Sequence, residues 1–394
     1  MQPIYLDNAS TTKISSEVLN EMLPVLSEVY GNPNSLHSFG REAVSLVDIA
    51  RDRIAQSINA KSSEIYFTSG GTEANNWALI GLALANKNKG NHIITSQIEH
   101  SSVLESCKKL ESMGFEVSYL PVDETGLVSI ADLIHNINQK TILVSVMAAN
   151  NEIGTIQNLK TISKITHEKG VLFHTDAVQA FGSFKLDVKD LEVDALSLSA
   201  HKIHAPKGCG ALYIKKGVKI DPLIVGGNQE RNKRGGTLNV ASIVGFGKAT
   251  ELVSSNYTVI NKKLKSLREY FLSKLSQEID DTKVNGHPSQ KLAGLASVSF
   301  IGVDGEALAL MLDLNGIAVS NGSACMAGTN NEGHVLKAIG LTPDVAKSTI
   351  RFSFGVNNTK EEIDFVVDTL KKCVSKLRSI SPVRIQKNRT KRGK

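Results

Sequence analysis

Long apolar runs and a signal sequence are both absent from this chain of 394 residues. No apolar stretch is long enough to span a membrane, and the first residues, MQPIYLDNAS, lack the charged-then-apolar pattern of a secretory signal. We therefore expect a cytoplasmic protein with no membrane partner.

Cysteine is scarce as well. The four cysteines are widely separated and form no Cys-x-x-Cys pair, which argues against a disulfide framework and favours reduced thiols. His201, His204 and Cys209 lack a standard zinc-ligand spacing, so we expect no metal site. Cys107, Cys209 and Cys373 have the sequence surroundings of structural residues.

Net charge is also small outside the C-terminal end. The formal charge is +6, and residues 383–394 carry six Lys or Arg residues and no acid. Residues 1–382 therefore have a formal net charge of zero. Such a tail is typical of a disordered, solubilising end, and the alternative is weak binding of RNA or of an acidic partner. Direct nucleic-acid binding is not expected of the chain as a whole.

Short apolar runs alternate with helical patterns between residues 64 and 214. Strands that alternate with helices need crossover connections, and these connections join parallel strands. We therefore predict an α/β fold whose large domain has a mostly parallel seven-stranded sheet flanked by helices. The predicted strands are 65–68, 92–95, 115–120, 141–147, 171–174, 193–198 and 211–214.

A second region begins near Asn261 with a long amphipathic helix to about Ile279, and its further strands and helices predict a smaller α+β domain. Its predicted strands are 296–301, 317–320 and 349–354, and its further helices are 305–314 and 360–377. The predicted domains are 16–260 for the large domain, 1–15 with 261–382 for the small domain, and 383–394 for the tail.

Lys202 lies between two predicted core strands, in the stretch LSAHKIHAPKG at 198–208. A lysine fixed in desolvated surroundings can act as a nucleophilic amine and form a Schiff base with a carbonyl compound. The alternative is a loop lysine that extends to water.

Polar residues follow several of the predicted strands. Gly71 and Thr72 lie between a strand and a helix, where backbone N–H groups can bind an anion; a tight turn with a threonine cap is the alternative. Asp176 follows the strand at 171–174, at the sheet edge where α/β folds bind ligands, and Gln179 could reach the same ligand; Asp176 as a helix cap is the alternative. His100 could stack on a flat ring and transfer protons, or it could be a packed loop residue.

Two residues stand out in the second region. Cys325 lies in the small, polar, glycine-rich segment 320–333, which predicts an exposed loop and a reactive rather than a structural thiol. Arg351 lies inside an otherwise apolar strand and should be paired. Its guanidinium suits an α-carboxylate, with an internal salt bridge as the alternative.

These residues occur in motifs that resemble those of the cysteine desulfurases, in the class V aminotransferase group of fold-type I pyridoxal phosphate enzymes. The resemblance extends from Tyr5 to Pro382. The motifs are FTSGGTEANN at 67–76, EH at 99–100, NNEIG at 150–154, HTDAVQ at 174–179, SAHK at 199–202, RGGT at 234–237, GSAC at 322–325 and IRFS at 350–353.

The resemblance implies pyridoxal 5'-phosphate as cofactor, held as a Schiff base on Lys202. Asp176 would pair with the ring nitrogen, Gln179 would contact the ring hydroxyl, and His100 would stack on the ring and act as acid and base. The phosphate would be bound by Gly71, Thr72, Ser199, His201 and the partner subunit's Thr237, which implies a homodimer.

The resemblance also implies the reaction. Asn151 would contact cofactor and substrate, Arg351 would bind the carboxylate of L-cysteine, and Cys325 would take the sulfur as a persulfide and release L-alanine. An acceptor protein, either an iron–sulfur scaffold or a tRNA-thiolation enzyme, would then collect the sulfur. The alternatives are a selenocysteine lyase or another class V enzyme and, outside enzymes, a sulfur-transfer scaffold or RNA-associated binding protein.

Overall fold

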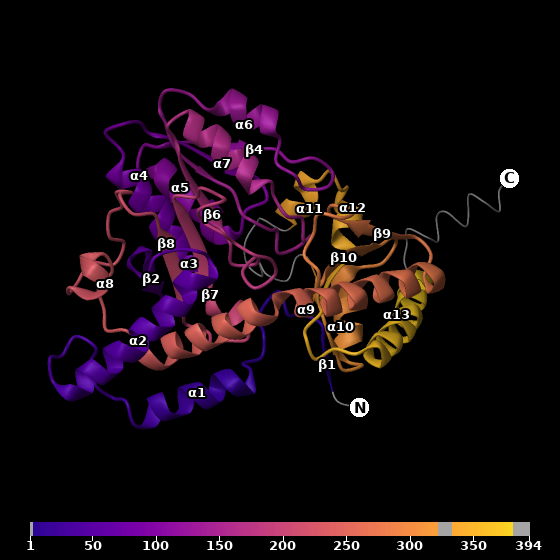
Figure 1. The fold of residues 1–394 in the computed structure, drawn as a ribbon. Helices are drawn as coiled ribbons and strands as arrows, with labels where there is room; N and C mark the ends of the chain where they lie inside the picture. Colours follow the sequence, from indigo (N-terminus) through magenta and orange to yellow (C-terminus); the bar gives the residue numbers. More distant parts are fainter. Residues whose placement is uncertain (1–2, 322–332, 381–394) are drawn as a thin grey trace.

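The computed structural model describes residues 3–321 and 333–380, and its centre is a seven-stranded sheet (Figure 1). The strand order is β2-β8-β7-β6-β5-β3-β4; β8 is antiparallel to both of its neighbours and the other pairs are parallel. The predicted fold class is therefore confirmed. The strands are β2 (Ile65–Thr68), β3 (His92–Ser96), β4 (Glu116–Leu120), β5 (Thr141–Ser145), β6 (Leu172–Asp176), β7 (Ala195–Ser199) and β8 (Gly210–Ile214).

Helices cover both faces of this sheet. Successive strand residues point to opposite faces, so Ile94 and Val144 enter the core under α2, α7 and α9 (Val240–Glu278), while Ile93 and Leu143 enter the core under α3, α4 and α5. The helices of this part are α1 (Ser16–Ser27), α2 (Ser38–Ser57), α3 (Gly71–Asn76), α4 (Leu82–Ala85), α5 (Ser101–Ser112), α6 (Ile130–Asn136), α7 (Leu159–Glu168) and α8 (Gln229–Asn232).

The smaller unit contains a four-stranded antiparallel sheet, β12-β13-β10-β9, and a parallel pair, β1-β11. The predicted strand 317–320 is two short strands in different sheets, and the N-terminal arm (residues 3–15) adds β1 to one of them. Its elements are β1 (Ile4–Tyr5), β9 (Thr282–Asn285), β10 (Leu295–Phe300), α10 (Gly305–Asp313), β11 (Ile317–Ala318), β12 (Ser320–Asn321), α11 (His334–Ala338), α12 (Pro343–Lys347), β13 (Thr349–Ser353) and α13 (Lys360–Ile380).

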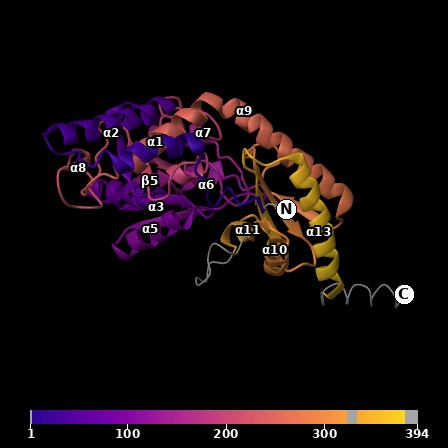
Figure 2. The same cartoon turned by 90° about the horizontal axis from the view of Figure 1, so that it is seen from below.

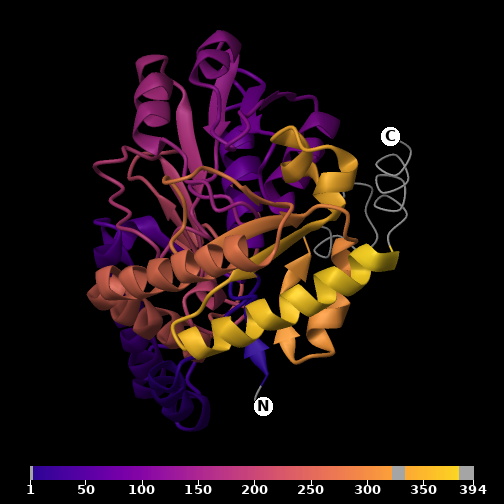
Figure 3. The same cartoon turned by 90° about the vertical axis from the view of Figure 1, so that its right-hand side faces the viewer.

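The long helix α9 (Val240–Glu278) links the two units, running from α1 and α2 to a position beside α13 (Figures 2 and 3). The predicted start near Asn261 was wrong, because Phe246, Ala249 and Val253 continue the buried face of the same helix toward its N-terminus. The helix crosses the predicted domain boundary at 260/261 without a break, and that boundary stays a prediction. No helix among the described residues is long and apolar enough to cross a membrane.

Three cysteines are packing residues. Cys107, Cys209 and Cys373 are free thiols buried in three separate hydrophobic cores, in agreement with the expected structural role. Burial raises the pKa of each thiol, which keeps it uncharged and unreactive. Cys325 and the basic tail lie outside the described residues.

A buried ion pair anchors the surface segment that carries α8 and Thr237. Arg51 on α2 donates from Nη1 and Nη2 to the Glu230 carboxylate at 2.8 and 2.7 Å, and the Phe67 N–H donates to the same carboxylate at 2.7 Å. The two charged side chains are 8% and 1% exposed.

We expect Glu230→Gln to lower the free energy of unfolding by about 3 kcal/mol, because it leaves the Arg51 charge buried without a counter-charge. Urea unfolding measures the change. Asp190→Asn, which breaks an exposed pair with Lys160, is the control and should cost under about 1 kcal/mol. Equal effects of the two variants would contradict the anchoring role.

Candidate active site

A cavity of about 270 Å³ lies at the sheet edge where β6 and β7 end and α3 and α5 begin. The carboxyl ends of parallel strands meet at this edge, which explains why residues from distant motifs gather there. The predicted site residues that line the cavity are Gly71, Thr72, His100, Asn151, Asp176, Gln179, Ser199, His201, Lys202 and Arg351. Thr237 is exposed on the surface and does not line the cavity, and Cys325 lies outside the described residues.

Lys202 ends the short 3-10 turn Ala200–Lys202 that follows β7, and its side chain reaches into the cavity. Its Nζ donates to the backbone oxygens of Ala9 and Ser10 at 2.6 and 2.8 Å. The Thr12 hydroxyl in turn donates to the His201 carbonyl at 2.8 Å. The N-terminal arm therefore holds this lysine from outside the sheet.

A chain of hydrogen bonds joins Asp176 to His100. Asn75 on α3 donates from Nδ2 to Asp176 Oδ2 at 2.6 Å and to Ser102 Oγ at 2.9 Å. Because that hydroxyl accepts from Asn75, its own proton is available to His100 Nδ1, 2.8 Å away. The second Asp176 oxygen accepts the Val178 N–H at 2.9 Å.

These contacts decide the state of His100, the residue that caps α5. Its Nδ1 accepts the Ser102 backbone N–H at 3.1 Å, so the neutral ring carries its proton on Nε2. Burial lowers the pKa of His100; the Asp176 charge opposes this shift, and Lys202 and His334 add to it. The imidazole is therefore neutral at pH 7.

One end of the cavity suits an anion. Gly71 and Thr72 form the first turn of α3, and a side chain at Gly71 would place its Cβ 2.6 Å from Val178 Cγ2. Ser199 Oγ and Gln179 Oε1 are buried polar atoms with no hydrogen-bond partner among the described residues, so a ligand could use both. These groups could hold a phosphate and the polar edge of a flat ring.

His201 also lines the cavity. Its Nδ1 is 3.1 Å from the Thr11 hydroxyl. Burial, with the charges of Lys202 and Lys207, lowers the pKa of His201 to about 4. It is therefore a neutral polar group at pH 7 that can contact an anion through a hydrogen bond.

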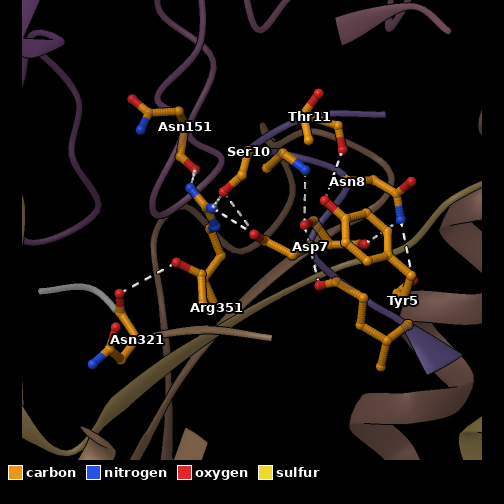
Figure 4. Close-up of polar contacts among 12 residues, drawn as sticks. Tyr5, Asp7, Asn8, Ser10, Thr11, Asn151, Asn321 and Arg351 are labelled. Carbon is orange, nitrogen blue, oxygen red and sulfur yellow. Dashed lines mark hydrogen bonds and ion pairs between the residues drawn. The ribbon is translucent and has the colours of Figure 1, made fainter. Parts of the chain in front are cut away.

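Arg351 also lines the cavity, on β13, with its side chain only 5% exposed. Figure 4 shows its guanidinium between the arm and the turn that follows β5. Nη1 donates to the Asn151 carbonyl at 2.9 Å, and Nη2 donates to Asp7 Oδ1 at 2.8 Å and to Ser10 Oγ at 2.5 Å.

Some residues around the cavity were not predicted. Asn75 lies three positions after Thr72 on α3, a helical spacing that could have indicated a shared face. Glu99 is fully buried and Glu152 is half-buried, and burial raises their pKa values to about 8 and about 7. Within residues 3–321 and 333–380, no group of three or more His, Cys, Asp and Glu residues is placed to hold a metal ion.

The chain is similar to known proteins over nearly its whole length. The family model described as aminotransferase class-V matches residues 4–366. A protein named cysteine desulfurase IscS from Clostridium botulinum (strain Hall) is 50% identical over 382 residues, which are 96% of each chain. A protein of the same name from Methanosarcina thermophila is 49% identical over 387 residues, covering 98% of this chain and 96% of the relative.

Solved structures agree with the sequence relatives. A NifS-like protein matches with a TM-score of 0.90 at 40% identity, over 95% of this chain and 100% of that one. A structure titled SspA in complex with cysteine matches with a TM-score of 0.80 at 36% identity, over 89% of this chain and 98% of that one.

Proposed function

The chain belongs to the class V aminotransferase family and, within it, to the cysteine desulfurases, and from this premise we propose how its own residues perform the reaction. L-Cysteine is the proposed substrate, L-alanine the product, and a persulfide on Cys325 the form in which sulfur leaves the site. The observation that carries the proposal is the gathering of Lys202, Asp176, His100 and Arg351 around one cavity.

The cavity fits pyridoxal 5'-phosphate, the cofactor of this family. The buried Ser199 Oγ and Gln179 Oε1 without described partners, and the first turn of α3, suit its phosphate and ring hydroxyl. Lys202 would hold it as a Schiff base and Asp176 would pair with its ring nitrogen. When bound, the cofactor supplies an electron sink for negative charge on the substrate. Its phosphate would be held by Gly71, Thr72, Ser199, His201 and the partner subunit's Thr237.

The protein residues would orient the substrate and move its protons. Arg351 and Asn151 would hold the carboxylate of L-cysteine, and the Lys202 amine would take and return protons at the substrate carbon. The Cys325 thiolate would attack the substrate sulfur: a sulfur–sulfur bond forms, the carbon–sulfur bond breaks, and its electron pair stays on the carbon side. Proton addition to that carbon then completes L-alanine.

Single turnover with L-cysteine tests this proposal. Purified enzyme loaded with cofactor should form L-alanine together with one added sulfur atom on Cys325, seen by mass spectrometry of the Cys325 peptide. If Cys325→Ala forms alanine from cysteine at the full rate, a lyase-type enzyme replaces the persulfide mechanism. A colourless, inactive protein after incubation with pyridoxal phosphate would favour the non-enzymatic scaffold.

The pH dependence should show the neutral state of His100. Protonation would place a proton on Nδ1 opposite the Ser102 N–H, which disfavours the charged ring. Activity should therefore stay constant as the pH falls from 7 to the ordinary histidine pKa of about 6.5, and decline only at lower pH. Ser102→Ala removes a hydroxyl that stabilises the neutral ring, so the acidic limb of kcat should move to higher pH. Ser106→Ala, one turn along α5, is the control. If the acidic limb of kcat in Ser102→Ala stays at the wild-type pH, the proposed role of the Ser102 hydroxyl in keeping His100 neutral is contradicted.

The proposed assembly is a homodimer. The outer face of α1 exposes Leu19, Leu23 and Leu26, at spacings of four and three residues, and Leu36 nearby is 91% exposed. Exposed Thr237 would then serve the partner's site. Leu23→Glu with Leu26→Glu should yield monomers in sedimentation experiments, whereas Leu310→Glu on α10 should not; a dimeric double variant would place the interface elsewhere.

The proposed sulfur acceptor is a protein of iron–sulfur cluster assembly or of tRNA thiolation. Transfer of labelled sulfur from Cys325 to purified candidates of both classes would distinguish them. Selenocysteine should be compared with cysteine in the same assay, because a strong preference for selenocysteine would indicate the lyase alternative.

A further inference from the structure

Arg351 has few N–H groups left for a substrate. A guanidinium has five, and both N–H groups of Nη2 are directed at the arm, toward Asp7 Oδ1 and Ser10 Oγ (Figure 4). Nη1 uses one N–H on the Asn151 carbonyl. One N–H of Nη1 therefore remains beside the arm contacts, together with the N–H of Nε, which has no partner among the described residues.

The direction of approach is restricted as well. A second cavity beside Arg351 has a volume of only about 10 Å³ and is lined by Glu152, so it holds at most about one water molecule. A substrate must therefore enter from the 270 Å³ cavity. Carboxylates bind arginine best through two parallel hydrogen bonds from neighbouring nitrogens. Such a pair of bonds from Nη1 and Nη2 of Arg351 needs one N–H of each nitrogen, and both N–H groups of Nη2 are already bonded to the arm.

Asp7 is the arm residue that, like the proposed substrate, offers a carboxylate to Arg351. It is a carboxylate 2.8 Å from Nη2, and it also accepts the Ser10 hydroxyl at 2.9 Å. Its side chain is 20% exposed, so it can turn to water, while its backbone stays paired with Ser353 of β13. Wherever it turns, its negative charge stays close to an incoming carboxylate.

We infer that Asp7 is a specificity-determining residue that competes with the substrate's carboxylate for Arg351 and sets the affinity for cysteine. The inference rests on the proposed function, in which Arg351 binds that carboxylate. While substrate is absent, Asp7 balances the charge of a nearly buried arginine. When substrate binds, its carboxylate takes over the Nη2 contact.

Asp7→Asn keeps the shape and one acceptor oxygen, removes the charge, and replaces the second oxygen with an amide N–H₂ group. The probe is 3-mercaptopropionate, which has the thiol and carboxylate of cysteine and no amine, and its binding to holoenzyme is measured by calorimetry. We expect about tenfold tighter binding in Asp7→Asn, since two like charges near one arginine repel through a partly screened medium. Cysteamine, which has the amine and thiol but no carboxylate, should bind wild type and variant equally.

Controls separate the possible failures. Asp368→Asn removes an exposed acid from α13 and should leave both affinities unchanged. Asp7→Ser is a second uncharged variant in case Asn impairs folding, and thermal unfolding checks both. Unchanged or weaker binding of 3-mercaptopropionate to the uncharged variants would overturn the inference while leaving the proposed function intact. If Arg351→Gln binds the probe as well as wild type does, Arg351 does not bind the carboxylate. Both the inference about Asp7 and that part of the proposed function are then wrong.

Discussion

Lys202→Ala should lower alanine formation from L-cysteine by about 10³-fold or more, because one amine carries both the covalent attachment of the cofactor and a proton transfer. The variant should also lose the visible absorbance band of a lysine-bound cofactor. The position of Lys202 supports this expectation: the 3-10 turn after β7 directs the side chain into the cavity, and the arm carbonyls of Ala9 and Ser10 hold its amine.

Single-turnover kinetics and the absorption spectrum measure the two effects together. Lys207→Ala is a matched control, because Lys207 is exposed in the loop that follows and does not line the cavity. Cofactor can still bind Lys202→Ala without a covalent bond, so added methylamine should restore part of the activity. A variant that keeps the wild-type rate and spectrum would show that another amine performs these tasks.

Asp176→Asn should lower kcat by about 10²- to 10³-fold, as expected for the loss of a charge aimed at the reacting group. Two structural effects combine in this variant. The anion opposite the expected ring nitrogen is lost, and an amide N–H₂ now faces either the Asn75 Nδ2 or the Val178 N–H, both of which are donors. If the Asn75 amide turns to relieve this contact, Ser102 no longer receives its hydrogen bond and His100 loses its support.

The variant Asp176→Glu keeps the charge and should retain more activity than Asp176→Asn, while Asp48→Asn on the exposed side of α2 should be neutral. Removing the Asp176 charge also removes the interaction that raises the pKa of His100, so the acidic limb of the rate profile should move to lower pH. Equal activity of the Glu and Asn variants would argue that shape, not charge, matters at this position.

The locations of the site residues followed from local patterns wherever those residues stand at the ends of elements. Asp176 ends β6, Ser199 ends β7 and His100 caps α5, so alternating strands and helices were enough to place them at one sheet edge. The start of α9 could not be placed in the same way. Its N-terminal half is buried against α1 and α2, and a helix buried on several sides loses the amphipathic pattern that marks its face.

By itself, the sequence determined the fold class, the family and the chemical identity of the residues around the cavity, because motif spacing and strand periodicity are local properties of the chain. The tertiary structure alone decided how those residues are held. Lys202 bonds to Ala9 across 193 positions, Arg351 to Asp7 across 344, and Asp176 to Asn75 across 101. No periodicity encodes such contacts, since they form only when the cores of both units bring the arm, the sheet edge and β13 together.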